Sequence, residues 1–158
     1  MELNKKIIED RKNLAQRLQS FPRPLVFTNG CFDILHRGHV DYLTRSAALG
    51  SCLIVGVNDD NSVRRLNKGE NRPINCLRDR MEVLAGLECI DWIVPFYEDS
   101  PLEIIQLLAP EQLVKGGDWP IEKIVGAKFV TENGGEVHSM EQNYTHSTTK
   151  LIHQIKQM

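Results

Sequence analysis

The stretch TNGCFDILHRGHVDYL, residues 28–43, follows the apolar run LVF and changes from a strand pattern to a helical one. Two histidines, His36 and His39, stand on either side of Gly38, where the helix is expected to begin. Glycine leaves almost no side-chain bulk there, and the first turn of a helix has backbone N–H groups that lack partners within the helix. The stretch therefore predicts an electropositive cradle for a phosphate group whose negative charge increases during a reaction.

Strand-like apolar runs alternate with helical patterns along the rest of the chain. The runs are LVF at 25–27, CLIVGV at 52–57, DWIVPF at 91–96, QLV at 112–114 and EVHSM at 136–140. Runs that are apolar on both faces are typical of parallel strands covered by helices on both sides. The sequence therefore predicts an α/β fold: a doubly wound, Rossmann-like, five-stranded parallel sheet with helices on both faces. In such a sheet, ligands bind beyond the carboxyl ends of the strands, where the order of connections reverses.

Two segments show the helical spacing most clearly, each with apolar residues along one stripe. The stripes are Val40, Leu43 and Ala47 within 40–49, and Leu77, Met81, Leu84 and Leu87 after Pro73. Each stripe is expected to cover one face of the sheet.

The length of 158 residues fits a single domain. Residues 4–19 carry a further helical stripe before FPRP breaks the pattern. That stripe consists of Ile7, Leu14 and Leu18. We therefore expect an N-terminal helical extension over 1–24, packed on a main domain over 25–158.

Composition excludes several classes of protein. With 19 Lys plus Arg against 21 Asp plus Glu, the net charge of -2 gives no overall attraction for a polynucleotide, so no nucleic-acid partner is expected. The longest apolar runs are too short to cross a bilayer, and we expect no membrane association. The four cysteines lie far apart without a CxxC pair, and no signal peptide is apparent. We expect free thiols and a soluble, cytoplasmic protein.

The motif HRGH at 36–39 resembles the HxGH tetrad of the nucleotidylyltransferase superfamily. Further motifs follow in the order found in its ADP-heptose synthase adenylyltransferase family, and the resemblance covers roughly residues 24–155. The motifs are NGCFDILHRGH at 29–39, RPINCLRDR at 72–80, VKGGDW at 114–119, GGEVH at 134–138 and STTK at 147–150. The resemblance implies transfer of AMP from ATP to the anomeric phosphate of a heptose 1-phosphate, which gives ADP-heptose and pyrophosphate for lipopolysaccharide or other surface glycans.

The resemblance also implies roles for individual residues. His36 and His39 would bond the α-phosphate and bridging oxygens in the transition state. Arg80 is similar to an arginine that related cytidylyltransferases place on the phosphates, and Lys68 to a lysine of their mobile loop, with Arg64 and Arg65 close by as alternatives. The nucleotide phosphates would be supported by the backbone of Thr28, Asn29, Gly30, Cys31 and Phe32. Hydroxyl and N–H donors for the β and γ phosphates would come from Ser147 and Thr148, with Lys150 nearby. The segment beside the base would be Gly117, Asp118 and Trp119.

The cofactor and partners follow from the same resemblance. Mg²⁺ would accompany ATP and keep most of its waters, so no dedicated metal ligands are expected in the chain. Asp33 is the nearest acidic candidate for the substrate or metal region. The partners are ATP and a sugar 1-phosphate, which a separate kinase would supply because a stand-alone transferase is expected. A homodimer is also expected. The chain departs from the family pattern before STT, where Thr145 and His146 replace glycine and a tyrosine or isoleucine.

Each motif also has a purely structural interpretation. Histidines at i and i+3 are often surface residues of a helix, and Cys31 with the two histidines is too small a set for a closed zinc site. Asp33 is equally typical of a turn or a helix cap. Ser147 and Thr148 fit a helix N-cap. The segment 72–80 fits the solvated side of a helix, and Trp119 fits a packing residue.

Three other functions remain open from the sequence. The nearest is a cytidylyltransferase acting on glycerol 3-phosphate or a similar small phosphorylated alcohol, because the HxGH and STT machinery is common to both. A class I aminoacyl-tRNA synthetase fragment shares the HxGH motif, but the chain lacks a KMSKS-like segment. A non-catalytic nucleotide-binding module is the third.

Overall fold

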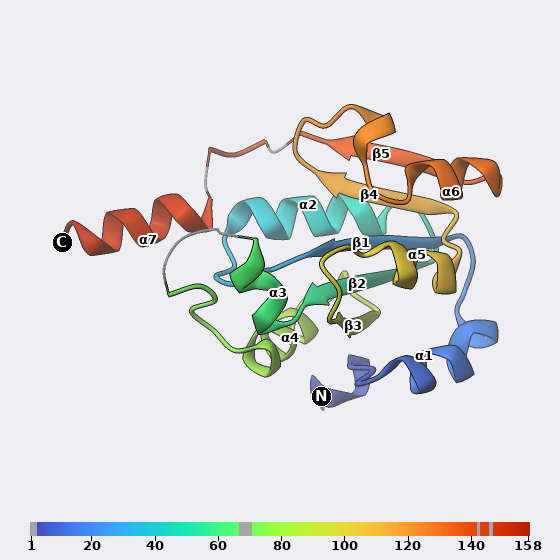
Figure 1. Cartoon of the computed structure of the whole chain (residues 1–158), viewed down its shortest axis with the longest axis horizontal. Coiled ribbons are helices and arrows are strands. Elements are labelled where there is room, and N and C mark those ends of the chain that lie inside the picture. The colour runs from blue at the N-terminus through green and yellow to red at the C-terminus, as the bar shows by residue number, and fades with distance from the viewer. Residues whose placement is uncertain (1–2, 67–70, 142, 146) are drawn as a thin grey trace.

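The computed structural model describes residues 3–66, 71–141, 143–145 and 147–158. Within them, five parallel strands form one sheet in the order β3-β2-β1-β4-β5 (Figure 1). The strands are β1 (Leu25–Gly30), β2 (Cys52–Asn58), β3 (Trp92–Phe96), β4 (Gln112–Gly116) and β5 (Glu136–Met140). The predicted fold class is confirmed, and every predicted strand is present.

Helices cover both faces of this sheet, and the last one extends away from the body of the domain (Figure 1). The α-helices that follow β1 are α2 (Arg37–Ala47), α3 (Asp60–Arg65), α4 (Leu77–Ala85), α5 (Leu102–Leu108), α6 (Ala127–Glu132) and α7 (Thr148–Lys156). A short 3-10 helix, η3 (Ile121–Lys123), precedes α6.

Alternate residues of each strand enter two separate hydrophobic cores. In β1, Leu25 and Phe27 pack with residues of α5 and α6, whereas Val26 packs on the opposite face with residues of α2 and α4. Strand β2 is buried at every position, which explains its continuous apolar run. Side chains of a strand point alternately to the two faces of the sheet. Because both faces are buried here, apolar and polar residues do not alternate along β2.

The N-terminal segment differs from the predicted helix over 4–19. Helix α1 covers only Arg11–Arg17, because Asp10 caps it by accepting a 2.8 Å hydrogen bond from the backbone N–H of Asn13. Before the cap, Ile7 forms an isolated parallel bridge with Ile93 of β3. Two 3-10 helices flank α1, namely η1 (Leu3–Lys6) and η2 (Leu18–Ser20). The proposed boundary between an extension and a main domain stays a prediction.

The predicted stripe of α2 is also corrected. Val40 is 41% exposed, whereas Leu43 is fully buried. The buried face instead includes two polar residues, Tyr42 and Ser46, and the Ser46 hydroxyl donates to the Tyr42 carbonyl. A hydrophobic periodicity could not show this face, because hydrogen bonds rather than apolar character allow these two side chains to be buried.

The order of connections reverses at β1. The chain leaves β1 for β2 and β3 on one side, then returns to form β4 on the other side, so Thr28 of β1 lies level with both Val55 of β2 and Val114 of β4. The carboxyl ends of β1 and β4 therefore form the topological switch point where a ligand is expected.

All four cysteines lie within the described residues and are free thiols. Among the helices of the described ranges, none combines the length and the apolar character needed to cross a bilayer.

The start of β1 depends on a carboxylate. Glu111 accepts hydrogen bonds from the backbone N–H of Leu25 at 2.7 Å and from Arg23 Nη1 at 2.9 Å. Burial acts to raise the pKa of Glu111, but these two donors outweigh it, so the pKa lies below its ordinary value. The ionised form is therefore favoured in the folded protein.

This carboxylate should make the stability of the fold sensitive to acid. Because the folded-state pKa is lowered, the stabilisation is fully present above the unfolded pKa of about 4.3 and is lost as pH falls through the folded value. Melting temperatures of Glu111→Gln should thus lie below those of the wild type at pH 7, and the gap should close towards about pH 3. Glu132→Gln, at an exposed ion pair with Lys128, is the control and should show little effect. A gap that stays constant with pH would contradict the assignment.

Candidate functional site

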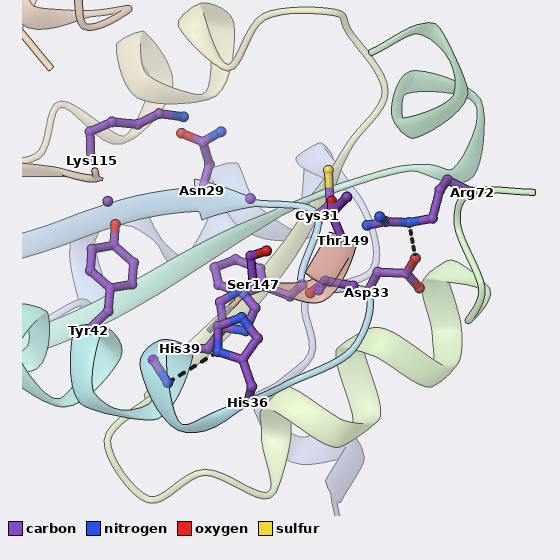
Figure 2. Close-up of a pocket in the computed structure, with 15 residues that line it drawn as sticks. Asn29, Cys31, Asp33, His36, His39, Tyr42, Arg72, Lys115, Ser147 and Thr149 are labelled. Carbon is purple, nitrogen blue, oxygen red and sulfur yellow. Dashed lines mark hydrogen bonds and ion pairs between the residues drawn. The ribbon is translucent and has the colours of Figure 1, made fainter. Parts of the chain in front are cut away.

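A pocket of about 250 Å³ lies at the switch point (Figure 2). Its walls come from the end of β1, the loop that follows it, the first turns of α2, Arg72 before α4, the end of β4 and the start of α7. Among the residues predicted for the site, those that line it are Asn29, Gly30, Cys31, Phe32, Asp33, His36, His39, Ser147 and Thr148. Segments more than a hundred residues apart in sequence therefore meet where the motifs predicted a phosphate site.

His36 begins α2 as its N-cap. Its Nδ1 accepts a 3.1 Å hydrogen bond from the backbone N–H of Gly38. A Cβ atom at Gly38 would lie only 3.0 Å from Cε1 of the same ring, so a larger residue would push the ring out of its place. Since Nδ1 is an acceptor, the proton of a neutral ring is assigned to Nε2, which makes Nε2 a hydrogen-bond donor. The glycine of the tetrad thus fixes both the position of the ring and its tautomer.

His39 lies against His36 in the same pocket. The two rings stack with centroids 3.9 Å apart and an interplanar angle of 27° (Figure 2). His39 also meets the Phe32 ring in an edge-to-face arrangement, with centroids 5.5 Å apart. The two imidazoles converge on one cavity, as the HxGH motif predicted, and are more than surface residues of a helix.

Tyr42 holds the start of α2 over the sheet. Its hydroxyl meets the Thr28 hydroxyl of β1 and donates to the Val114 carbonyl of β4 at 3.3 Å. Burial raises the pKa of Tyr42 to about 12, so the phenol stays protonated at neutral pH. Thr28, predicted to support the nucleotide phosphates, is fully buried and lies outside the lining of the pocket. Its side chain anchors α2.

The start of α7 forms another wall. Ser147 caps the helix by accepting a 3.1 Å hydrogen bond from the backbone N–H of Lys150, as the capping interpretation predicted. The Thr148 hydroxyl donates to the Ile34 carbonyl at 3.0 Å, which joins α7 to the loop after β1. The amino end of α7 therefore lies at the pocket, where its dipole favours an anion. Lys150 does not line this pocket, and its Nζ donates to the Thr145 carbonyl at 3.1 Å.

Asp33 is engaged by the loop that precedes α4. It is 3% exposed, and its carboxylate accepts from Arg72 Nε at 2.6 Å and from the backbone N–H groups of Ile74 and Asn75 at 2.8 Å each. The cap of α2 is His36, so the helix-cap interpretation of Asp33 is wrong. Asp33 instead organises residues 72–75.

Arg80 lies behind the wall of the pocket. It is 1% exposed, so the solvated-helix interpretation is wrong at this position. Nη1 donates to the Cys31 carbonyl at 2.6 Å, and Nη2 donates to the Asn58 carbonyl at 2.7 Å and to Asp60 at 2.8 Å. Nε donates to the Asn75 carbonyl at 3.1 Å. Arg80 thus ties three segments together and is not among the described residues that line the pocket.

A second hollow of about 210 Å³ adjoins the first on the β4 side and shares Asn29 and Lys115 with it. Trp119 lines this hollow and is 49% exposed, so it is not simply a packing residue. Its Nε1 donates to the Gly116 carbonyl at 3.2 Å. Gly117 has φ +111°, and a Cβ there would lie 2.8 Å from Trp119 Nε1, so glycine is needed for the ring to fold back.

Several predicted residues lie elsewhere. Gly117 and Asp118 line neither of these two hollows. Lys68 and His146 lie outside the described residues. Among the residues that the structure describes, no group of three or more His, Cys, Asp and Glu side chains is placed to hold a metal ion.

The family model described as cytidylyltransferase-like matches residues 27–154, a range that runs from β1 into α7 and includes both histidines. The chain belongs to the cytidylyltransferase-like family. The resemblance predicted from the motifs is thereby confirmed.

Curated relatives of this cytidylyltransferase-like chain include proteins named "Bifunctional protein HldE". The one from Pseudomonas paraeruginosa is 53% identical over 84% of this chain and 28% of its own length. Those from Shewanella amazonensis and Haemophilus influenzae are 55% and 54% identical over 83% and 92% of this chain, and over 27% and 30% of their own lengths. The chain therefore spans less than a third of the curated relatives it matches.

Solved structures with a similar fold include the lipopolysaccharide core biosynthesis protein from Thermoplasma volcanium. It is 26% identical with a TM-score of 0.61, over 77% of this chain and 98% of that one. A pantoate-beta-alanine ligase from Francisella tularensis has a TM-score of 0.64 at 11% identity, over 93% of this chain and 72% of that one. The latter likeness concerns the fold alone.

Sequence reasoning missed part of the pocket of this cytidylyltransferase-like domain. Lys115 is the residue before the last one of β4 and lines the pocket together with Asn29. Its position near the carboxyl end of a strand next to β1 is a signal that could have identified it. Tyr42 follows His39 by one helical turn, which also predicts proximity. Arg72 opens the motif RPINCLRDR, but the motif did not show that it lies at the pocket, because its place depends on an ion pair with Asp33, 39 residues earlier.

Proposed function

We propose that the protein is a nucleotidyltransferase that moves AMP from ATP to a heptose 1-phosphate and releases ADP-heptose and pyrophosphate. The observation that carries this proposal is the stacked pair His36 and His39, which faces one pocket together with the amino ends of α2 and α7. The family, the motifs shared with ADP-heptose synthases and the identity to the HldE proteins support the choice of ATP and a heptose phosphate.

The reaction needs charge stabilisation and positioning more than proton transfer. A phosphate oxygen of the sugar attacks the α-phosphorus of ATP, the bond to the bridging oxygen breaks, and pyrophosphate leaves in line with the attack. The attacking oxygen already carries negative charge, so no general base is required. His36 and His39 donate hydrogen bonds to the α-phosphate and bridging oxygens, where negative charge increases.

The remaining contacts of the nucleotide come from the loop after β1, the start of α7 and the hollow beside Trp119. The backbone from Asn29 to Phe32 supports the phosphates, and the amino end of α7 with Ser147 and Thr148 receives the β and γ phosphates. The base occupies the hollow beside Trp119, whose exposed ring offers a surface for stacking. Lys68, Lys150, Gly117 and Asp118 keep the roles that the family resemblance implies.

Mg²⁺ fits this pocket only as an ion carried by ATP. Asp33 is the acidic side chain among the described lining residues, and both of its oxygens already accept hydrogen bonds from residues 72–75. The phosphate oxygens of ATP and water would thus be the ligands. Bound there, the ion would neutralise charge on the phosphates and on the leaving pyrophosphate.

The family description favours a second candidate, a cytidylyltransferase acting on glycerol 3-phosphate or a similar alcohol phosphate. The two histidines and the start of α7 would serve either donor equally, because they contact phosphates rather than the base. A synthetase fragment and a non-catalytic module find less support, since the HldE proteins match over most of this chain.

Pyrophosphate release with a panel of substrates tests the proposal. ATP and CTP are each combined with heptose 1-phosphate, glycerol 3-phosphate and no acceptor. We expect turnover with ATP and heptose 1-phosphate at least tenfold above every other pair. Preference for CTP with glycerol 3-phosphate would replace the heptose assignment, and release with no pair would support the non-catalytic module.

Three expectations about the cellular setting accompany the proposal. A sugar kinase must supply the heptose 1-phosphate, because the pocket performs no step that makes it. The homodimer and the cytoplasmic location stay predictions from the sequence.

A further inference from the structure

Arg72 is a buried cation in the wall of the pocket that no motif assigned to a ligand. It is 8% exposed, and its Nε donates to Asp33. Burying a guanidinium costs free energy unless partners compensate it, and hydrophobic residues often stabilise a fold as well as a buried ion pair does. A buried arginine that also lines a cavity is therefore a candidate for binding.

The ion pair with Asp33 uses only part of the Arg72 guanidinium group. Asp33 meets Nε, and Figure 2 shows the outer end of the guanidinium turned into the pocket, towards the side where Cys31 and Thr149 lie. Two of the three hydrogen bonds that the Asp33 carboxylate accepts come from the backbone N–H groups of Ile74 and Asn75. The negative charge is thus shared among three donors, which leaves part of the charge of Arg72 for an anion. A guanidinium group that donates to a carboxylate through Nε can still donate to a phosphate group through its terminal nitrogens.

The position of Arg72 separates it from the base hollow. Residues 72–75 are tied to the end of β2, because Arg80 bonds both the Asn58 carbonyl of β2 and the Asn75 carbonyl. Lys115 and the hollow of Trp119 lie on the other flank of β1, beside β4. In-line transfer needs room for two phosphate-bearing groups around the α-phosphorus, one that attacks and one that leaves. The pocket thus has a flank for the nucleotide and an opposite flank with its own buried cation.

We propose that Arg72 binds the phosphate of the acceptor substrate and that Asp33 is the positioning residue that aims it. This inference rests on the proposed function for the identity of the acceptor, a sugar 1-phosphate, but concerns a residue that the function did not assign. The shared chemistry is a phosphate group, which has two sources here: the acceptor and the β or γ phosphate of ATP. Acceptor specificity then depends on a loop that the HxGH and STT motifs do not include.

Binding to the enzyme in complex with α,β-methylene-ATP tests the proposal. This analogue cannot release pyrophosphate, so calorimetry can measure the affinity for heptose 1-phosphate, and for glycerol 3-phosphate, without turnover. We expect Arg72→Ala to weaken acceptor binding at least tenfold and to change the affinity for the analogue less than twofold. Arg72→Lys should recover part of the loss, because it retains the charge but not the fork. Arg78→Ala, at a partly exposed arginine of α4, is the matched control and should bind both ligands as the wild type does.

A double-mutant cycle tests the positioning role of Asp33. Asp33→Asn should weaken acceptor binding in the wild type but add little in the Arg72→Ala background, because its effect passes through Arg72. Thermal melting of each variant verifies the fold. Equal losses of acceptor and analogue affinity would place Arg72 on the phosphates of ATP, and unchanged acceptor affinity would reduce it to a structural residue; either overturns the inference. A failure of the proposed function gives a different result. In that case the wild type itself would bind glycerol 3-phosphate but not heptose 1-phosphate.

Discussion

Replacing either histidine of the stacked pair should lower kcat by about two orders of magnitude or more. Each substitution, His36→Ala or His39→Ala, removes a donor aimed at oxygens whose charge increases only in the transition state. The affinity for ATP in the ground state should change far less. Steady-state kinetics of pyrophosphate release, with KM and kcat determined separately, provide the measurement.

His36 needs an additional variant because it also caps α2. Loss of an N-cap costs about 1 kcal/mol, so His36→Ala should melt earlier than the wild type. Asn is a good N-cap residue but does not supply the Nε2 donor, so His36→Asn should restore the melting temperature without restoring kcat. His153→Ala, on the exposed part of α7, controls for the loss of an imidazole. A defect confined to KM, or activity recovered in His36→Asn, would contradict the role in the transition state.

Replacing Arg80 should have the second large effect, on stability. Arg80→Met leaves Asp60 and the carbonyls of Cys31 and Asn58 without their buried donor. Removing one partner of a buried charged network typically costs about 3–5 kcal/mol in the free energy of unfolding. Urea unfolding followed by circular dichroism would measure the change.

The stability experiment also separates two views of Arg80. If this arginine acts mainly on the phosphates, as the family resemblance implies, Arg80→Met should weaken ATP binding while the unfolding free energy stays close to that of the wild type. Arg78→Met, at an exposed position of the same helix, should alter neither quantity much. The contacts of Arg80 lead us to expect the loss of stability.

Much of the fold could be predicted because its signals are local. Strand β2 is a continuous apolar run, and parallel strands buried on both faces have that pattern. The tetrad also predicted a helix start with little side-chain bulk, and Gly38 leaves there the room that the His36 ring occupies. These features depend on residues close together in the chain.

The features that the sequence did not predict depend on contacts between distant residues or on the burial of polar side chains. Asp33 and Arg72 are separated by 39 residues, and Arg80 contacts a carbonyl 49 residues earlier. A sequence shows which residues are charged and how far apart they lie in the chain, but it does not show which of them form ion pairs in the folded protein. The start of the N-terminal helix was predicted wrongly for another reason. The apolar stripe continued before Asp10, but Asp10 caps the helix, so it begins only after that residue.

The hydroxyl of Thr148 joins the last helix to the loop after the first strand, and this link has a consequence during protein synthesis. Because the chain leaves the ribosome from its amino end, both imidazoles and all five strands emerge before α7 does. One wall of the cavity is missing until then, because residues 147–149 emerge last among the segments that line it. A nascent chain should therefore be unable to hold a triphosphate until α7 has emerged and docked.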